Sequence, residues 1–194
     1  MTGFTIDEQP THALLSLRSE DGTNRLTRKV VCELAGAVAD LAPKPLIVTG
    51  NDRFFSAGAD LNEIAALTST AALEFARMGQ ALMNAVDIFP APVLAAIKGY
   101  CMGGGLDLAL SCDLRIASKH AVFGHRGAAL GLITGWGGTQ RLPRLVGKAR
   151  ALEMFTAAEK LDGAHALRCG LIDAIADDPV AAALARVLGA NSAS

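Results

Sequence analysis

Hydrophobic and polar positions follow two periods that alternate along the chain. Short apolar runs typical of buried strands occupy residues 12–19, 45–50, 92–97, 113–118, 121–124 and 171–175. Between these runs, apolar residues recur every three or four positions, which predicts helices over 26–41, 70–88 and 104–111. Strands that alternate with helices need crossover connections, so the pattern predicts an α/β fold with a mostly parallel sheet.

The last residues form a segment of their own in the pattern. Asp178 followed by Pro179 is a typical helix start, and the chain ends in the small polar residues "NSAS". We therefore divide the sequence into a core domain, 1–176, and a short C-terminal helix with a tail, 177–194.

Composition and charge argue against a nucleic-acid-binding protein, a membrane-spanning protein and a metal site. The formal net charge of −1 and the lack of a basic stripe argue against nucleic acid as a partner. The N-terminus does not resemble a signal peptide, and no apolar run is long enough to span a membrane. Four cysteines lie far apart with no metal-ligand spacing, and they are expected to be buried thiols of a cytoplasmic protein: Cys32, Cys101, Cys112 and Cys169. We expect no metal site.

Three consecutive glycines, 103–105, stand where a predicted strand gives way to a predicted helix. Their N–H groups can approach a ligand closely, and the helix start adds partial positive charge. Such a turn suits a phosphate or a carbonyl oxygen that gains negative charge, but neither the phosphate-loop nor the dinucleotide motif is present. Tight packing between strand and helix explains the glycines equally well.

A second glycine turn, "SAGADLNEI" over 56–64, follows the strand at 45–50. Asp60 and Glu63 have the spacing of a helix capping box, which is their simplest role. Ser56 is not a hydrolase nucleophile, because Phe54 stands where that motif needs glycine. The turn therefore offers backbone N–H groups at the end of a parallel strand, where ligands of such sheets bind.

Three stretches together resemble the crotonase (enoyl-CoA hydratase/isomerase) superfamily: "FFSAGADL" (54–61), "IKGYCMGGGLDLALSCDLRIAS" (97–118) and "FGHRGAALGLITGWGGTQRLPRLVG" (123–147). The resemblance runs from about residue 12 to 176. It implies a crotonase-like spiral of ββα units, here with a shortened C-terminal helical region, assembled as a homotrimer or hexamer. It also implies an acyl-CoA thioester as substrate, with coenzyme A as part of that substrate and no other cofactor.

The resemblance assigns roles to both glycine turns. It places the backbone N–H groups of Ala59 and Gly104 in an oxyanion hole around the thioester oxygen. Two preorganised donors favour the charge that an enolate puts on that oxygen. The same resemblance and the neighbouring sequence give the positions expected to contact substrate or coenzyme A: Ala57, Gly58, Asp60, Leu61, Gly103, Gly127 and Trp136.

The catalytic pattern departs from that of the family's hydratases, which use two glutamates. Asp107 stands at the first glutamate position and Gly127 at the second. Asp107 is an acid in an apolar run, so burial should raise its pKa, although backbone N–H groups of its own helix would also satisfy it. His125 is a candidate for the lost base or for holding a substrate carboxylate, and a structural surface histidine is the alternative.

With one acid/base group retained, we expect an enzyme that stabilises a thioester enolate and isomerises an enoyl-CoA through Asp107. Hydration by a diverged hydratase, thioester hydrolysis and decarboxylation stay open. The alternative outside catalysis is an inactive homologue that binds acyl-CoA or a protein partner.

Overall fold

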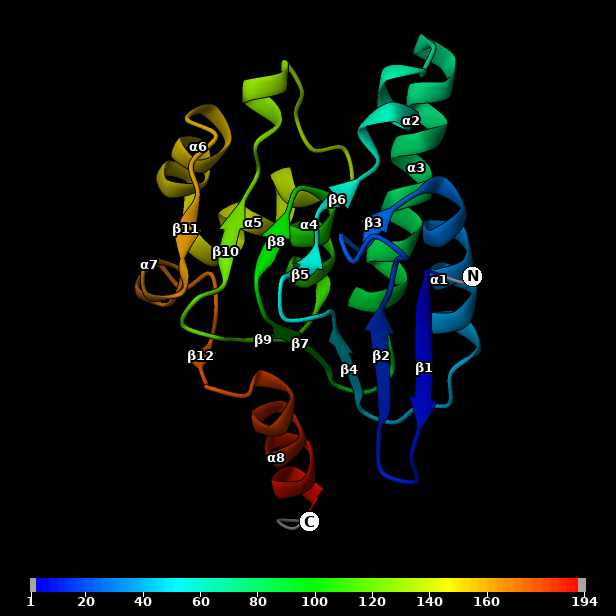
Figure 1. The fold of residues 1–194 in the computed structure, drawn as a ribbon, viewed down its shortest axis with the longest axis vertical. Coiled ribbons are helices and arrows are strands. Elements are labelled where there is room, and N and C mark those ends of the chain that lie inside the picture. The colour runs from blue at the N-terminus through cyan, green and yellow to red at the C-terminus, as the bar shows by residue number, and fades with distance from the viewer. Residues whose placement is uncertain (1–2, 192–194) are drawn as a thin grey trace.

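The computed structural model describes residues 3–191 and contains two main sheets (Figure 1). In the larger sheet β1 and β2 are antiparallel and all other neighbours are parallel. Its strands, in spatial order, are β1 (Phe4–Glu8), β2 (Ala13–Leu17), β4 (Leu46–Thr49), β7 (Val93–Ile97), β9 (Leu114–Ala117) and β12 (Ala174–Ile175). The expected α/β fold with a mostly parallel sheet is confirmed.

The second sheet and a short strand pair lie beyond the carboxyl ends of the parallel strands of the large sheet (Figure 1). The second sheet has the order β11 (Leu161–Asp162), β10 (Val122–Gly124), β8 (Tyr100–Met102), β5 (Phe54–Ser56), and the pair is β3 (Arg25–Leu26) with β6 (Gly58–Ala59). A strand of the large sheet is thus followed by one of the second sheet and then by a helix, as in β7, β8 and α4 (Gly104–Ser111). This is the ββα repeat that the resemblance to the crotonase superfamily implies.

The central strands β4 and β7 are buried on both faces of the large sheet, which explains their continuous apolar runs. In β7, Val93, Ala95 and Ile97 face the main core, whereas Leu94 and Ala96 face a smaller cluster. The main core lies under α1 (Arg28–Asp40) and α3 (Ser69–Asp87), and the smaller cluster lies under α8 (Pro179–Asn191). Helix α8, red in Figure 1, therefore packs on the face opposite α1 and α3.

The remaining helices are shorter than α1 and α3. They are α2 (Leu61–Ala65), the 3₁₀ helix η1 (Gly127–Leu130), α5 (Gly138–Val146), α6 (Lys148–Thr156) and α7 (Gly163–Arg168). The predicted helices at 26–41, 70–88 and 104–111 correspond to α1, α3 and α4. None of the helices within residues 3–191 is long and apolar enough to cross a membrane.

Three expectations need correction. The predicted strand at 171–175 is shorter, because the N–H groups of Leu171 and Ile172 bond to Ala166 O at the end of α7 and only β12 pairs in the sheet. Cys32 is exposed on α1 rather than buried, while Cys101 and Cys112 are buried. The capping box at Asp60 is half formed, because the Glu63 carboxylate accepts from Arg28 N of α1 (2.7 Å) instead of from Asp60 N.

Candidate active site

The two glycine turns predicted from the sequence touch each other. Gly58 has φ +89°, and a Cβ there would lie 2.5 Å from Met102 O and 2.9 Å from Gly104 N. Only glycine allows this backbone conformation and this approach without strain. The close contact brings the β5–β6 turn against the start of α4.

Ala59 and Gly104 lie next to each other across this contact. A Cβ at position 104 would be 3.3 Å from the backbone nitrogen of Ala59. Gly104 is the first residue of α4, so its N–H has no acceptor within the helix and lies at the positive end of the helix dipole. Gly103 before it has φ +51°, which turns the chain from β8 into the helix.

Both residues line a cavity of about 590 Å³ whose other walls are mainly apolar. Helices α2 and α3 and the segment 125–136 supply most of these walls. The large apolar side chains are Leu61, Ile64, Leu67, Phe75, Met102, Leu130, Leu132, Ile133 and Trp136. A cavity of this composition suits a ligand with an apolar chain.

Asp107, in the first turn of α4, also lines the cavity and is 1% exposed. Burial raises its pKa to about 7. Opposing this, the hydroxyl of Thr134 donates a hydrogen bond to Oδ2, and Arg141 and the backbone N–H of Gly138 also favour the ionised form. The alternative in which N–H groups of its own helix satisfy this carboxylate is wrong, since the groups that hydrogen-bond to it are Thr134 and the backbone N–H of Gly138, both outside α4.

His125 is buried beside Asp107 and is not the surface histidine that the sequence left as an alternative. Its Nε2 lies 3.4 Å from Asp107 Oδ1, and neither atom has a hydrogen-bond partner among the described residues. Burial lowers the pKa of His125 to about 4, so the ring is neutral near pH 7. The two groups form an acid/base pair at the cavity wall.

The N-terminus of α5 packs against both Asp107 and His125. A Cβ at Gly138 would lie 2.2 Å from Asp107 Oδ1 and 3.0 Å from His125 Nε2, so only glycine leaves room for both side chains. Sequence reasoning missed Gly138, Thr134 and Arg141 as neighbours of Asp107. The glycine pair at 137–138 before a helix was the available signal, because the same pattern at 103–105 had been noted.

Trp136 and Gly127 occupy other parts of the cavity wall. The Trp136 indole is buried against Phe75, with ring centroids 5.2 Å apart, and its Nε1–H donates to Phe75 O at 3.1 Å. Gly127 begins η1, and a Cβ there would lie 2.5 Å from Leu132 O. The backbone at position 127 therefore has no room for a side chain of any kind in this conformation.

Of the eleven residues predicted for the site, Ala57, Leu61 and Gly103 line the same cavity as the residues above, whereas Gly58 and Asp60 are not in its walls. Asp60 caps α2 through the N–H groups of Asn62 and Glu63. These bonds and the Arg25 guanidinium, 3.2 Å away, hold the pKa of Asp60 below its usual value.

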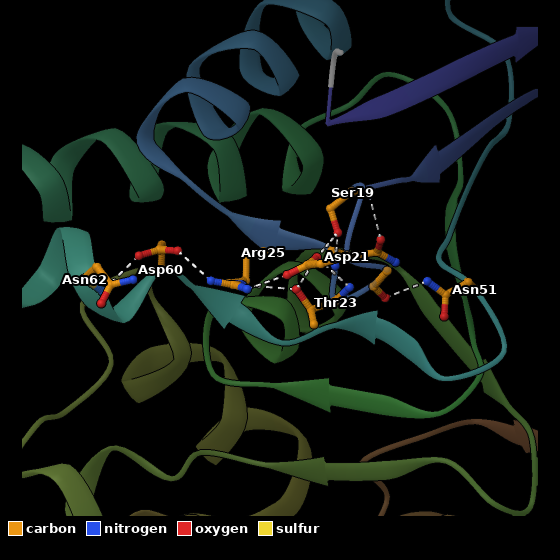
Figure 2. A network of polar contacts seen from close by, with 9 residues as sticks. Ser19, Asp21, Thr23, Arg25, Asn51, Asp60 and Asn62 are labelled. Atoms are coloured by element: carbon orange, nitrogen blue, oxygen red, sulfur yellow. Dashed lines mark hydrogen bonds and ion pairs between the residues drawn. The ribbon is translucent and has the colours of Figure 1, made fainter.

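Arg25 extends this network to a second carboxylate (Figure 2). It also pairs with Asp21, which accepts from Ser19 Oγ (2.7 Å) and Thr23 N (3.0 Å). The network ties the turn before β3 to the turn before α2. The network thus helps to hold the glycine turn at 56–64 in place.

The sequence matches the family model described as enoyl-CoA hydratase/isomerase over residues 8–189. The chain belongs to the enoyl-CoA hydratase/isomerase family. A probable enoyl-CoA hydratase of Bacillus subtilis is 41% identical over 90% of this chain and 65% of its own length. A 2,3-dehydroadipyl-CoA hydratase of Escherichia coli is 38% identical over 89% of this chain and 68% of its own length. This family member therefore spans about two thirds of the length of these curated relatives.

Solved structures agree with the family assignment. Pseudomonas aeruginosa DspI superposes with a TM-score of 0.93 at 36% identity, covering 100% of this chain and 82% of that one. An enoyl-CoA hydratase from Bacillus anthracis superposes with a TM-score of 0.87 at 33% identity, covering 97% and 74%. The expected family and the crotonase-like fold of this family member are confirmed.

Proposed function

We propose that this family member acts on an acyl-CoA thioester, holding the thioester oxygen with the N–H groups of Ala59 and Gly104 while Asp107 moves a proton. The observation that carries the proposal is the convergence of both glycine turns and one buried carboxylate on a single apolar cavity. Two backbone donors beside a mainly apolar cavity favour the charge of an enolate oxygen. A carboxyl group with a pKa of about 7 has both protonation states available near neutral pH.

The reaction that needs only this one group is double-bond isomerisation. Ionised Asp107 takes a proton from C2 of a 3-enoyl thioester, and the electron pair moves onto the thioester oxygen as a dienolate. The same proton then returns to C4, which leaves the double bond between C2 and C3. One carboxyl group both accepts and donates, so the chemistry does not depend on a side chain at position 127.

Hydration is a second candidate, and the position of His125 favours it. Neutral His125 would take a proton from water as the water oxygen bonds to C3 of a 2-enoyl thioester. Protonated Asp107 would give its proton to C2, and transfer between Nε2 and Oδ1, 3.4 Å apart, would restore both groups. The relatives named as hydratases support this candidate, whereas the absence of a carboxylate at position 127 supports isomerisation.

Exchange of α-protons tests the shared part of both reactions. A saturated acyl-CoA is incubated with the protein in heavy water, and loss of the C2 proton signal is followed by NMR. We expect Asp107→Asn to slow exchange by about 10²–10⁴-fold. Asp177→Asn, which changes an exposed carboxylate on the C-terminal side of the core, is the matched control and should exchange like the parent protein.

The substrates then separate the candidates. A 3-enoyl-CoA that becomes a 2-enoyl-CoA without uptake of labelled water oxygen indicates isomerisation. Oxygen uptake that His125→Gln abolishes, while α-proton exchange continues, indicates hydration. Binding of acyl-CoA without exchange would overturn both and favour an inactive binding homologue.

We also propose that copies of the chain assemble as a homotrimer or hexamer and act in the cytoplasm. The high content of hydrophobic residues, 51%, is the observation that supports subunit contacts. Light scattering coupled to gel filtration measures the assembly, and a monomer at micromolar concentration would overturn that part of the proposal.

A further inference from the structure

The hydroxyl of Thr134 makes two hydrogen bonds with different roles. It accepts from the backbone N–H of Trp136 at 3.4 Å, and it donates to Oδ2 of Asp107. Accepting from Trp136 uses one lone pair and leaves the hydroxyl proton free to point at the carboxylate. The hydrogen bond from Trp136 N–H thus orients the Thr134 hydroxyl so that its proton points at Asp107.

The two oxygens of Asp107 are consequently unequal. Oδ2 is occupied by a donated hydrogen bond, whereas Oδ1 has no hydrogen-bond partner and lies 3.4 Å from His125 Nε2. A proton on Oδ2 would face the hydroxyl proton of Thr134, so protonation of the carboxyl group favours Oδ1. The same contact limits rotation of the carboxyl plane.

We infer that Thr134 is a positioning residue, which fixes Oδ2 of Asp107 and makes Oδ1 the oxygen that gains and loses the proton. This inference deepens the proposed function and rests on it for its catalytic meaning. Thr134 itself does not touch reacting atoms in this scheme; it acts through Asp107. The role differs from a simple turn cap, for which only the bond from Trp136 would matter.

Three other groups set the charge around Asp107 and must be considered in any pH test. His125 lies beside Oδ1, Arg141 comes from α5, and Cys101 comes from β8. Burial lowers the pKa of His125 to about 4 and raises that of Cys101 well above its usual value. Arg141 carries a guanidinium group, which is a cation. Between pH 5 and 9, therefore, Asp107 is the group of this set whose charge changes.

The test compares Thr134→Val with Thr134→Ser. Valine has the shape of threonine without its hydroxyl, and serine keeps the hydroxyl without the methyl group. Loss of a donor to the carboxylate destabilises the ionised form, so we expect Thr134→Val to move the lower limb of the pH profile of α-proton exchange upward by roughly one pH unit. Thr134→Ser should keep the midpoint of the parent protein.

A titration that does not depend on catalysis separates this inference from the proposed function. The carboxyl ¹³C signal of Asp107, assigned by its loss in Asp107→Asn, is followed against pH in all three proteins. A midpoint that rises in Thr134→Val and is unchanged in Thr134→Ser supports the positioning role, even if no exchange is found and the proposed function fails. A midpoint that is the same in all three overturns the inference, as does an equal rise in both variants.

Discussion

The resemblance to the crotonase superfamily places Gly127 at the position of the hydratases' second glutamate, and the surroundings of Gly127 limit what a side chain there could do. Its Cα faces Leu132 O, and a Cβ would approach that oxygen to 2.5 Å. The carbonyl belongs to the backbone that closes η1, since Leu132 N bonds to Gly127 O at 2.8 Å. The η1 backbone can adopt this conformation only because residue 127 is glycine.

Restoring the family residue should not restore its chemistry. We expect Gly127→Glu to lower the free energy of unfolding by about 1–3 kcal/mol, because the η1 backbone must move to admit a Cβ. Hydration of a 2-enoyl-CoA should not rise above that of the parent protein. Urea unfolding measures the first effect and the hydration assay the second. Gly127→Ala is the matched control and should lose similar stability. A stable Gly127→Glu protein that hydrates faster would contradict this explanation.

At the scale of elements, the start of α5 is the part of the site most sensitive to added volume. Gly138→Ala would place a methyl group 2.2 Å from Asp107 Oδ1. We expect a loss of about 1–3 kcal/mol in unfolding free energy and slower α-proton exchange, because Asp107 and His125 must separate. Chemical denaturation and the exchange assay on the same variant check both effects.

The matched control is Gly36→Ala, an exposed position inside α1 with nothing within 4 Å of a new Cβ. There alanine should add about 1 kcal/mol of stability through helix propensity and leave exchange unchanged. If Gly138→Ala behaved like Gly36→Ala, the contact between α5 and the acid/base pair would not constrain the site.

The period of hydrophobic positions was sufficient to predict the long helices and strands, and insufficient to predict the short ones. The apolar repeat located α3, and the glycine block located α4 with the bounds 104–111 that the structure has. The segment 171–175 was predicted as a strand because four of its five residues are apolar. Leu171 and Ile172 are instead buried in the main core, and their backbone N–H groups bond to Ala166 O at the end of α7. Local composition does not distinguish a strand from a buried segment that follows the end of a helix.

The site was only partly predictable for a similar reason. Asp107 and His125 could be named because each lies in a recognisable motif. Their distance of 3.4 Å, and the positions of Thr134 and Gly138 around them, depend on how α5 packs against α4. Contacts between elements far apart in sequence carry no local signal.

Trp136 joins two elements and offers a direct probe of the cavity. Its indole fits against Gly79 of α3 and Gly104 of α4, where a Cβ would lie 2.2 Å and 2.5 Å from its ring. It is the only tryptophan of the chain. An acyl chain in the cavity should therefore change the intrinsic fluorescence, whereas free coenzyme A at the same concentration should change it less.

Titration with a medium-chain acyl-CoA, with emission followed at each step, measures this effect. Trp136→Phe removes the tryptophan emission and so shows that the change comes from Trp136. Binding seen by calorimetry without a change in fluorescence would show that the acyl chain lies elsewhere.

For the whole molecule, the acid/base pair links the site to the pH dependence of folding. Asp107 has a folded pKa of about 7 against a usual value of 3.8. Between those values the folded chain holds a proton that the unfolded chain has released, so this group's contribution to stability falls as pH rises. His125 has a folded pKa of about 4 against 6.5, so in that range the unfolded chain holds the extra proton and its contribution rises with pH.

The two contributions oppose each other over the overlap, from about pH 4 to 6.5, and each has a maximum slope of about 1.4 kcal/mol per pH unit. We expect His125→Gln to lose stability relative to the parent protein as pH rises through this window, because only the Asp107 contribution is left. Asp107→Asn should gain stability over the same window, and the double variant should follow the parent slope. Urea unfolding at half-unit pH steps measures the four slopes. If both single variants showed the same slope of unfolding free energy against pH as the parent protein, Asp107 and His125 would not titrate as two buried groups. The acid/base chemistry proposed for Asp107 would then lose its physical basis.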